Sequence, residues 1–119
     1  GAVVRYQIDI ANGAGGSVTA DTVVVSDPIP ANTKLCVSDV SPAPGCTAAD
    51  LPSFAAGTSG LALPAVGFEY SDDNGATWTA TPSPDAQGAD PAITNVRLAP
   101  TGTMVASGVF NITIGVVIE

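Results

Sequence analysis

The chain has 119 residues, enough for a single domain, and 45% of them are hydrophobic while 12% are charged. That balance excludes the highly charged, weakly hydrophobic composition of disordered chains. The 11 acidic residues outnumber the 3 basic ones and give a net charge of -8. Nucleic acids and anionic membrane surfaces are therefore poor partners, because both are bound through clustered Lys and Arg.

The first predicted strand begins almost at the N-terminus and alternates in polarity. Its apolar positions are Val4, Tyr6, Ile8 and Ile10. The residues between them are polar, which indicates one buried face and one wet face. A loop follows at residues 12–16.

Two further strands are predicted before the chain becomes irregular. The second covers residues 18–26, and the run Asp27-Pro28-Ile29-Pro30 is expected to end it. Residues 34–39 form a short third strand. Residues 40–64 are rich in Pro, Gly, Ala and Ser, which predicts an irregular excursion.

Cys36 lies in the predicted third strand, and Cys46 lies within that excursion. Their spacing does not suit a zinc knuckle, and the chain has no His to complete such a site. A local disulfide is the favoured interpretation, with two free thiols as the alternative. A disulfide would indicate an oxidising compartment and would stabilise the fold by roughly 3 kcal/mol.

Regular alternation returns in the second half of the chain. Residues 66–71 predict a strand, residues 72–75 a turn through Asn74-Gly75, and Thr77 and Trp78 its partner strand. A loop at residues 85–91 precedes a strand at 93–98, and the longest strand runs over 110–118. About seven strands with few helix signals predict an all-β fold, an immunoglobulin-like antiparallel β-sandwich forming one domain over residues 1–119.

The N-terminal third resembles a known family. Residues 1–12 (GAVVRYQIDIAN) and 23–33 (VVVSDPIPANT) are similar to the "conserved repeat" domain of bacterial and archaeal surface proteins, domain of unknown function eleven. The Asp-Pro-Ile-Pro-Ala turn is the specific part, and the remainder matches loosely through Tyr70 to Trp78 and the last strand. The resemblance implies an exported, non-enzymatic, immunoglobulin-like module, often found in tandem arrays, whereas here one copy is present.

Residues 71–78 match the S-x-D-x-G-x-T-W pattern of the Asp box found in sialidase-type propellers. The preferences of these residues for turns explain each specified position of the pattern without a catalytic role. The Asp73 carboxylate can accept backbone N–H groups, Gly75 can supply a positive φ, and Trp78 can pack. We therefore expect Asp73, Gly75 and Trp78 to form a structural turn.

Catalytic machinery is not evident in the sequence. Without His there is no Ser-His-Asp or Cys-His arrangement, and no phosphate-binding Gly-rich loop occurs. No enzyme activity, cofactor or catalytic residue is predicted.

Two acidic loops offer oxygen ligands of the kind that calcium prefers. The candidates are Asp72, Asp73, Asp85 and Asp90, with Asn74 and Gln87 beside them. Solvated loop carboxylates explain the same residues, so no metal site is assigned. Asn111-Ile112-Thr113 fits a glycosylation sequon, which requires Asn111 to point outward.

Both ends of the chain are apolar and strand-forming, and exposed strand edges pair with other chains. We therefore predict a secreted or cell-surface structural subunit that polymerises with copies of itself by strand addition. A spacer or adhesion repeat of a larger surface protein is the first alternative. A calcium- or glycan-binding module is the second. Any export signal would already have been removed, and no membrane insertion is expected.

Overall fold

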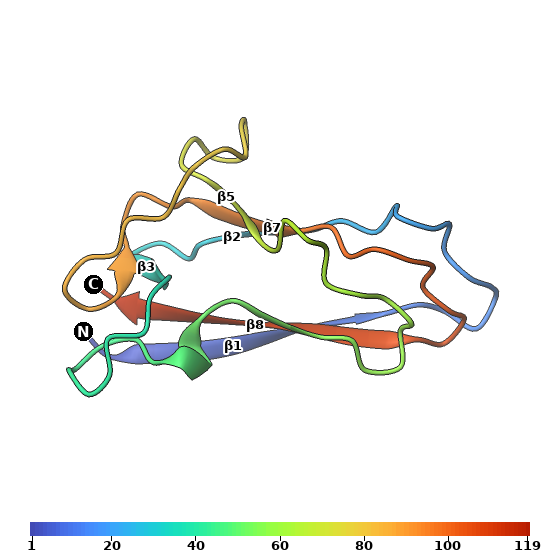
Figure 1. Cartoon of the computed structure of the whole chain (residues 1–119), viewed down its shortest axis with the longest axis horizontal. Helices are drawn as coiled ribbons and strands as arrows, with labels where there is room; N and C mark the ends of the chain where they lie inside the picture. Colours follow the sequence, from blue (N-terminus) through green and yellow to red (C-terminus); the bar gives the residue numbers. More distant parts are fainter.

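The computed structural model describes residues 1–119 and contains two packed antiparallel sheets (Figure 1). The larger sheet has the order β1-β8-β3-β6, and a short β4 also pairs with β8. The smaller sheet has the order β2-β7-β5. The prediction of an all-β sandwich is confirmed. The element bounds are β1 Val3–Ala11, β2 Val25–Pro28, β3 Thr33–Cys36, the 3-10 helix η1 Ala48–Asp50, β4 Ser53–Ala55, β5 Glu69–Ser71, β6 Ala89–Asp90, β7 Asn95–Leu98 and β8 Val109–Ile118.

The core lies between the sheets and is built largely on β8. Alternate β8 residues point inward, and Phe110, Ile112 and Ile114 are each at most 2% exposed. They meet Val96 and Leu98 of β7 from the facing sheet. Period-two burial in both layers therefore gives the single apolar interior that the sequence predicts.

The longest ladder joins the two ends of the chain. β1 and β8 pair antiparallel from Val3 opposite Val117 to Ala11 opposite Val109, so both termini lie at the same end of the sandwich (Figure 1). In constant-type immunoglobulin domains the first and last strands lie in different sheets. The immunoglobulin-like part of the fold assignment stays a prediction.

Residues 37–52, here called the covering segment, fold over the outer face of the larger sheet. The predicted disulfide between Cys36 and Cys46 is confirmed, and it ties this segment to β3. Both cysteines are buried together with Val117 of β8 and Ala89, in a small second apolar cluster. The first half of the excursion predicted over residues 40–64 is therefore packed against one end of the sheet.

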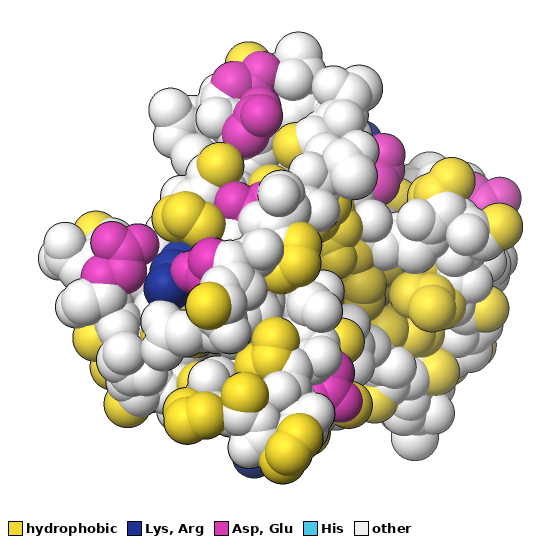
Figure 2. Space-filling model, turned by 60° about the vertical axis from the view of Figure 1, so that its left-hand side comes forward, with side chains coloured by type: hydrophobic (Ala, Val, Ile, Leu, Met, Phe, Trp, Pro, Cys, Tyr) yellow, Lys and Arg dark blue, Asp and Glu magenta, His cyan; other side chains and the backbone are white.

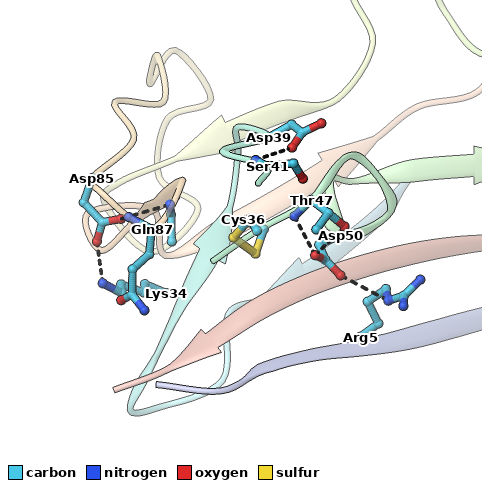
Figure 3. Close-up of a disulfide and its surroundings, with 11 residues drawn as sticks. Arg5, Lys34, Cys36, Asp39, Ser41, Thr47, Asp50, Asp85 and Gln87 are labelled. Atoms are coloured by element: carbon cyan, nitrogen blue, oxygen red, sulfur yellow. Dashed lines mark hydrogen bonds and ion pairs between the residues drawn. A yellow bond between two sulfur atoms is a disulfide. The ribbon is translucent and has the colours of Figure 1, made fainter. Parts of the chain in front are cut away.

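Asp50 anchors the covering segment at its far end (Figure 3). Its carboxylate accepts hydrogen bonds from the Thr47 backbone N–H and hydroxyl, at 2.7 and 2.9 Å, and lies 3.1 Å from Arg5 Nε. Gly115 of β8 lies directly beneath, where an added Cβ would stand 2.4 Å from the Asp50 carbonyl oxygen. Glycine at position 115 is therefore what lets η1 approach the sheet.

Several predicted strand boundaries are wrong. The second strand is not residues 18–26 but Val25–Pro28, because Asp21 adopts a positive φ of 58° and turns the chain. Pro28 lies within β2, where an edge position tolerates its missing N–H. The third strand ends at Cys36, not at residue 39, and the strand expected over 66–71 starts at Glu69 because Gly67 turns the chain with a φ of 66°.

Three other differences concern short segments. No strand forms at Thr77 and Trp78, because the Asp73 side chain takes up the Thr77 N–H that a ladder would have used. β4 lies inside the segment predicted to be irregular, and β6 inside the predicted loop at 85–91. Both have three residues or fewer, too short to show a periodic pattern.

Candidate functional site

The most distinctive surface feature is the side of β1 that faces away from β8, here called the β1 edge. β1 is nine residues long, yet β8 is the only strand that pairs with it. The backbone bonds Ile118 N–H to Ala2 O and Asn12 N–H to Gly108 O show that the even-numbered residues bond to β8. In an antiparallel ladder the alternate residues then direct their N–H and C=O groups to the other side. These residues are Val3, Arg5, Gln7, Asp9 and Ala11.

No hydrogen bond within the chain uses those outward backbone groups. Native proteins blunt exposed edges with proline, a bulge, an inward charge or charged side chains along the edge. β1 has no proline, its register with β8 is continuous and its inward residues are uncharged, while its two charged side chains, Arg5 and Asp9, are of opposite sign. The β1 edge is thus an open template for another strand.

The inward face of β1 is also incompletely covered. Tyr6, Ile8 and Ile10 are half-buried, whereas their direct partners on β8 are almost fully buried. The Tyr6 hydroxyl crosses to the other sheet and donates a 2.6 Å hydrogen bond to Asp27. Burial, together with the hydrogen bond to the Asp27 carboxylate and its charge, raises the pKa of the Tyr6 phenol.

The other strand edges are short. β2 ends in Pro28, β5 has three residues and leads into the Asp-box loop, and β6 has two residues followed by Pro91. β4 has three residues. The sequence predicts exposed edges at the chain ends, but it does not identify β1 as the long one. The pattern of residues 3–11 shows a strand, but it does not show which strands pair with it.

The Asp-box residues form a compact loop between β5 and the following chain. The Asp73 carboxylate accepts bonds from the Ser71 hydroxyl at 2.6 Å, the Thr77 N–H at 2.9 Å and the Thr77 hydroxyl at 2.6 Å. Led by the bond from the Ser71 hydroxyl, these contacts lower the pKa of Asp73 to about 2. Gly75 has a φ of 86°. All of the polar contacts of Asp73 are thus internal to the loop.

Trp78 packs beside the smaller sheet. The Arg97 guanidinium lies 4.5 Å from the centre of the Trp78 ring and pairs with Glu69 at 3.1 Å. The ring is half-buried. It therefore covers the charged outer face of β5 and β7.

The four calcium candidates do not form one cluster of carboxylates. Asp72 is exposed, and no group of three or more Asp, Glu, Cys or His side chains is close enough to hold a metal ion. Asp85 pairs with Lys34, which is the main cause of its lowered pKa, and it also accepts the Gln87 and Ala89 N–H groups (Figure 3). Asp90 is buried and accepts the Ser83 and Ala92 N–H groups. The carboxylates of Asp85 and Asp90 thus hold their own loop in shape.

Asn111 lies on the outward face of β8, half-buried between its neighbours Asp9 of β1 and Ala55 of β4. Strands flank it on both sides. An attached glycan would have to leave perpendicular to the sheet.

A concavity in the surface, here called the polar groove, has a volume of about 410 Å³. It runs beside the Pro-rich turn after β2 and reaches Asn74 of the Asp-box loop. Three asparagine side chains, those of Asn32, Asn74 and Asn95, line it without any hydrogen bond to the rest of the chain. The polar groove carries no charged side chain.

Apolar side chains gather in a hollow on the face shown in Figure 2, where acidic groups outnumber basic ones. A separate cavity of about 10 Å³, no larger than one water molecule needs, lies between the sheets and is lined by Ile8, Val25, Phe68 and other apolar side chains.

No family model, no curated protein and no solved structure matches this chain. The resemblance to the surface-protein repeat family stays a prediction. The structure contains no helix with the length and apolar character needed to cross a membrane.

Proposed function

We propose that this protein is a non-enzymatic structural subunit of an extracellular or cell-surface assembly, and that copies associate by strand addition at the β1 edge. The observation that carries the proposal is a nine-residue strand with one side unbonded and with no proline or bulge. A strand added there would satisfy the outward backbone groups and cover Tyr6, Ile8 and Ile10. The buried disulfide supports an oxidising compartment.

A homopolymeric filament is the assembly that we favour. A filament requires either a contact between two different surfaces that does not close into a ring, or two separate contact surfaces on each subunit. The β1 edge supplies one such surface.

Proline at position 7 tests the proposal, since the Gln7 N–H points outward and proline removes that donor while leaving the ladder to β8 intact. We expect the wild-type protein to elute as multimers in size-exclusion chromatography with light scattering, and to be visible as assemblies by negative-stain microscopy. Gln7→Pro should be monomeric and folded. Gln7→Thr, which keeps the N–H, is the matched control. A wild-type protein that is monomeric at all concentrations contradicts the proposal, as does a Gln7→Pro variant that assembles normally.

A spacer or adhesion repeat is the alternative structural function. The shared position of the termini bears on it, because segments continuing from Gly1 and Glu119 would leave from the same end. Repeats joined in this way would not stack end to end as a simple extended rod. The geometry therefore favours association through strands over a linear spacer.

The polar groove favours glycan binding as a second candidate function. Uncharged asparagine amide groups that have no partner within the protein suit the hydroxyl groups of a neutral sugar. A glycan array with the wild-type protein, followed by Asn95→Ala, tests this. Binding that is lost in Asn95→Ala supports it, and an array without any hit rejects it.

A further inference from the structure

The outward residues of β1 are complementary to the same residues of a second β1 that runs antiparallel. In chain order they are Val3, Arg5, Gln7, Asp9 and Ala11. If a second β1 runs antiparallel and is centred on Gln7, Arg5 of each copy faces Asp9 of the other, and Gln7 faces itself. Opposite charges placed directly across an antiparallel pair stabilise it.

We propose that two copies of this chain pair antiparallel through the β1 edge, about a two-fold axis at Gln7, and this inference rests on the proposed association by strand addition. The register follows from the backbone, because the residues whose N–H and C=O groups point outward are the same ones that carry these side chains. Each facing pair can exchange two backbone hydrogen bonds. The nine-residue length of β1 is used in full.

The charged groups are available for the contact. Arg5 uses its Nε for Asp50, but its side chain remains 56% exposed, which leaves the other guanidinium nitrogens accessible. Asp9 is exposed and accepts only the Gln7 amide, at 2.7 Å. By changing rotamer, the Arg5 and Asp9 side chains would reach the second copy while the fold stays intact.

The inward face is complementary in the same register. Tyr6 of one copy faces Ile8 of the other, and Val4 faces Ile10. All four side chains are incompletely buried in the single chain, and Val4 is 43% exposed. Pairing would place apolar groups against apolar groups inside a sheet that continues from one sandwich into the next.

This arrangement has a consequence for the larger assembly. A two-fold contact uses the same surface on both partners and closes on itself. Paired β1 edges therefore make a dimer, and a filament would be built from dimers through a second contact elsewhere.

Cysteine cross-linking tests the register. Facing residues in a hydrogen-bonded pair have Cα atoms about 5.5 Å apart, which a disulfide can span. Gln7→Cys should give a covalent dimer under mild oxidation, seen on a non-reducing gel. Ala11→Cys is the matched control and should stay monomeric on that gel, because residue 11 faces Val3 in the proposed register. Equal cross-linking of both variants would overturn the two-fold antiparallel register.

Charge pairing at the axis gives a second readout. Gln7→Glu and Gln7→Lys should each weaken dimerisation, by about fivefold, because like charges would face each other. An equimolar mixture of the two variants should restore the dimer, measured by analytical ultracentrifugation. Weakening without rescue in the mixture would overturn the axis at residue 7.

These outcomes separate the two proposals. If the wild-type protein assembles and Gln7→Pro does not, but Gln7→Cys fails to cross-link, only the two-fold register is wrong. If the wild-type protein is monomeric at all concentrations, both proposals are wrong.

Discussion

β1 and β8 are the two longest strands, and they pair with each other, but their surroundings differ. β8 lies inside the larger sheet, bonded to β1 on one side and to β3 and β4 on the other. The inward side chains of β8 are nearly inaccessible, while those of β1 are half-buried. Both strands have the same alternation of apolar residues in sequence.

The difference shows that alternation sets which face of a strand is apolar, while position in the sheet sets how deeply that face is buried. The outer faces differ in the same way. The covering segment protects Gly115 and Val117 of β8, whereas Gln7 and Asp9 of β1 stay open. β8 is organised for stability, and β1 is available for contact.

The largest expected effect comes from shortening two side chains that face each other across the β1–β8 ladder, one on each strand. Ile112→Ala on β8 should lower the free energy of unfolding by about 4 kcal/mol, because a side chain only 2% exposed leaves a cavity. Ile8→Ala, its direct partner on β1, should cost about 1.5 kcal/mol since part of that side chain is already in water. Urea unfolding measures both, and equal costs would break the comparison.

Removing the disulfide tests how much the covering segment over the end of β8 contributes to stability. The double variant Cys36→Ala/Cys46→Ala should lose about 3 kcal/mol of stability, because the covering segment is no longer tethered in the unfolded chain. The transition in urea should move to lower concentration. Wild-type protein treated with a reductant serves as the control and should behave like the double variant. A loss below about 1 kcal/mol would show that the covering segment holds without its tether.

A methyl group added at Gly115 tests the close packing of η1 against the outer face of β8. Gly115→Ala places a Cβ 2.4 Å from the Asp50 carbonyl oxygen, so η1 must move away. We expect a loss of about 2 kcal/mol, typical of overpacking, together with loss of the Arg5–Asp50 ion pair. Gly13→Ala, where nothing lies within 4 Å, is the control and should be near neutral. Thermal denaturation measures both variants.

The smallest expected effect concerns the polar link from β1 to the other sheet. Tyr6→Phe removes the hydrogen bond to Asp27 and should cost about 1 kcal/mol at neutral pH. Because the pKa of Tyr6 is raised on folding, the folded state holds the phenol proton more tightly than the unfolded state. Stability should therefore be full below about pH 10, the ordinary tyrosine value, and should fall as the pH rises above it.

Urea midpoints measured between pH 8 and 11 should show a shallower decline in Tyr6→Phe than in the wild type. Tyr70 also has its pKa raised by burial, so Tyr70→Phe separates the two contributions. Identical alkaline slopes in wild type and Tyr6→Phe would contradict the assignment to Tyr6.

The sequence predicted the long strands best. Residues 4–10 and 110–116 alternate strictly, and the observed bounds of the two strands lie within a residue or two of those expected. The strand predicted over residues 18–26 was wrong for two reasons. Val23-Val24-Val25 is an apolar run without alternation, and Asp21 takes a left-handed conformation that a local pattern does not reveal. At Thr77 and Trp78, hydrogen bonds from the Asp73 side chain outcompeted strand pairing.

The candidate site was less predictable than the fold. Exposed edges were expected, but which edge is free depends on the strands that pair with β8, namely β1, β3 and β4. Such pairing joins residues that are distant in sequence, so no window of neighbouring residues contains it. The self-complementary order of Arg5, Gln7 and Asp9 gains meaning only once the outward backbone groups are known.

The ladder between Val3–Ala11 and Val109–Ile118 also has a consequence for biosynthesis. Residues 3–11 are synthesised well before the segment that they pair with, residues 109–118. Contacts between such distant parts of a chain make folding slow. During that delay both sides of β1 expose unpaired backbone groups, so the nascent chain is most prone to aggregation before β8 is made.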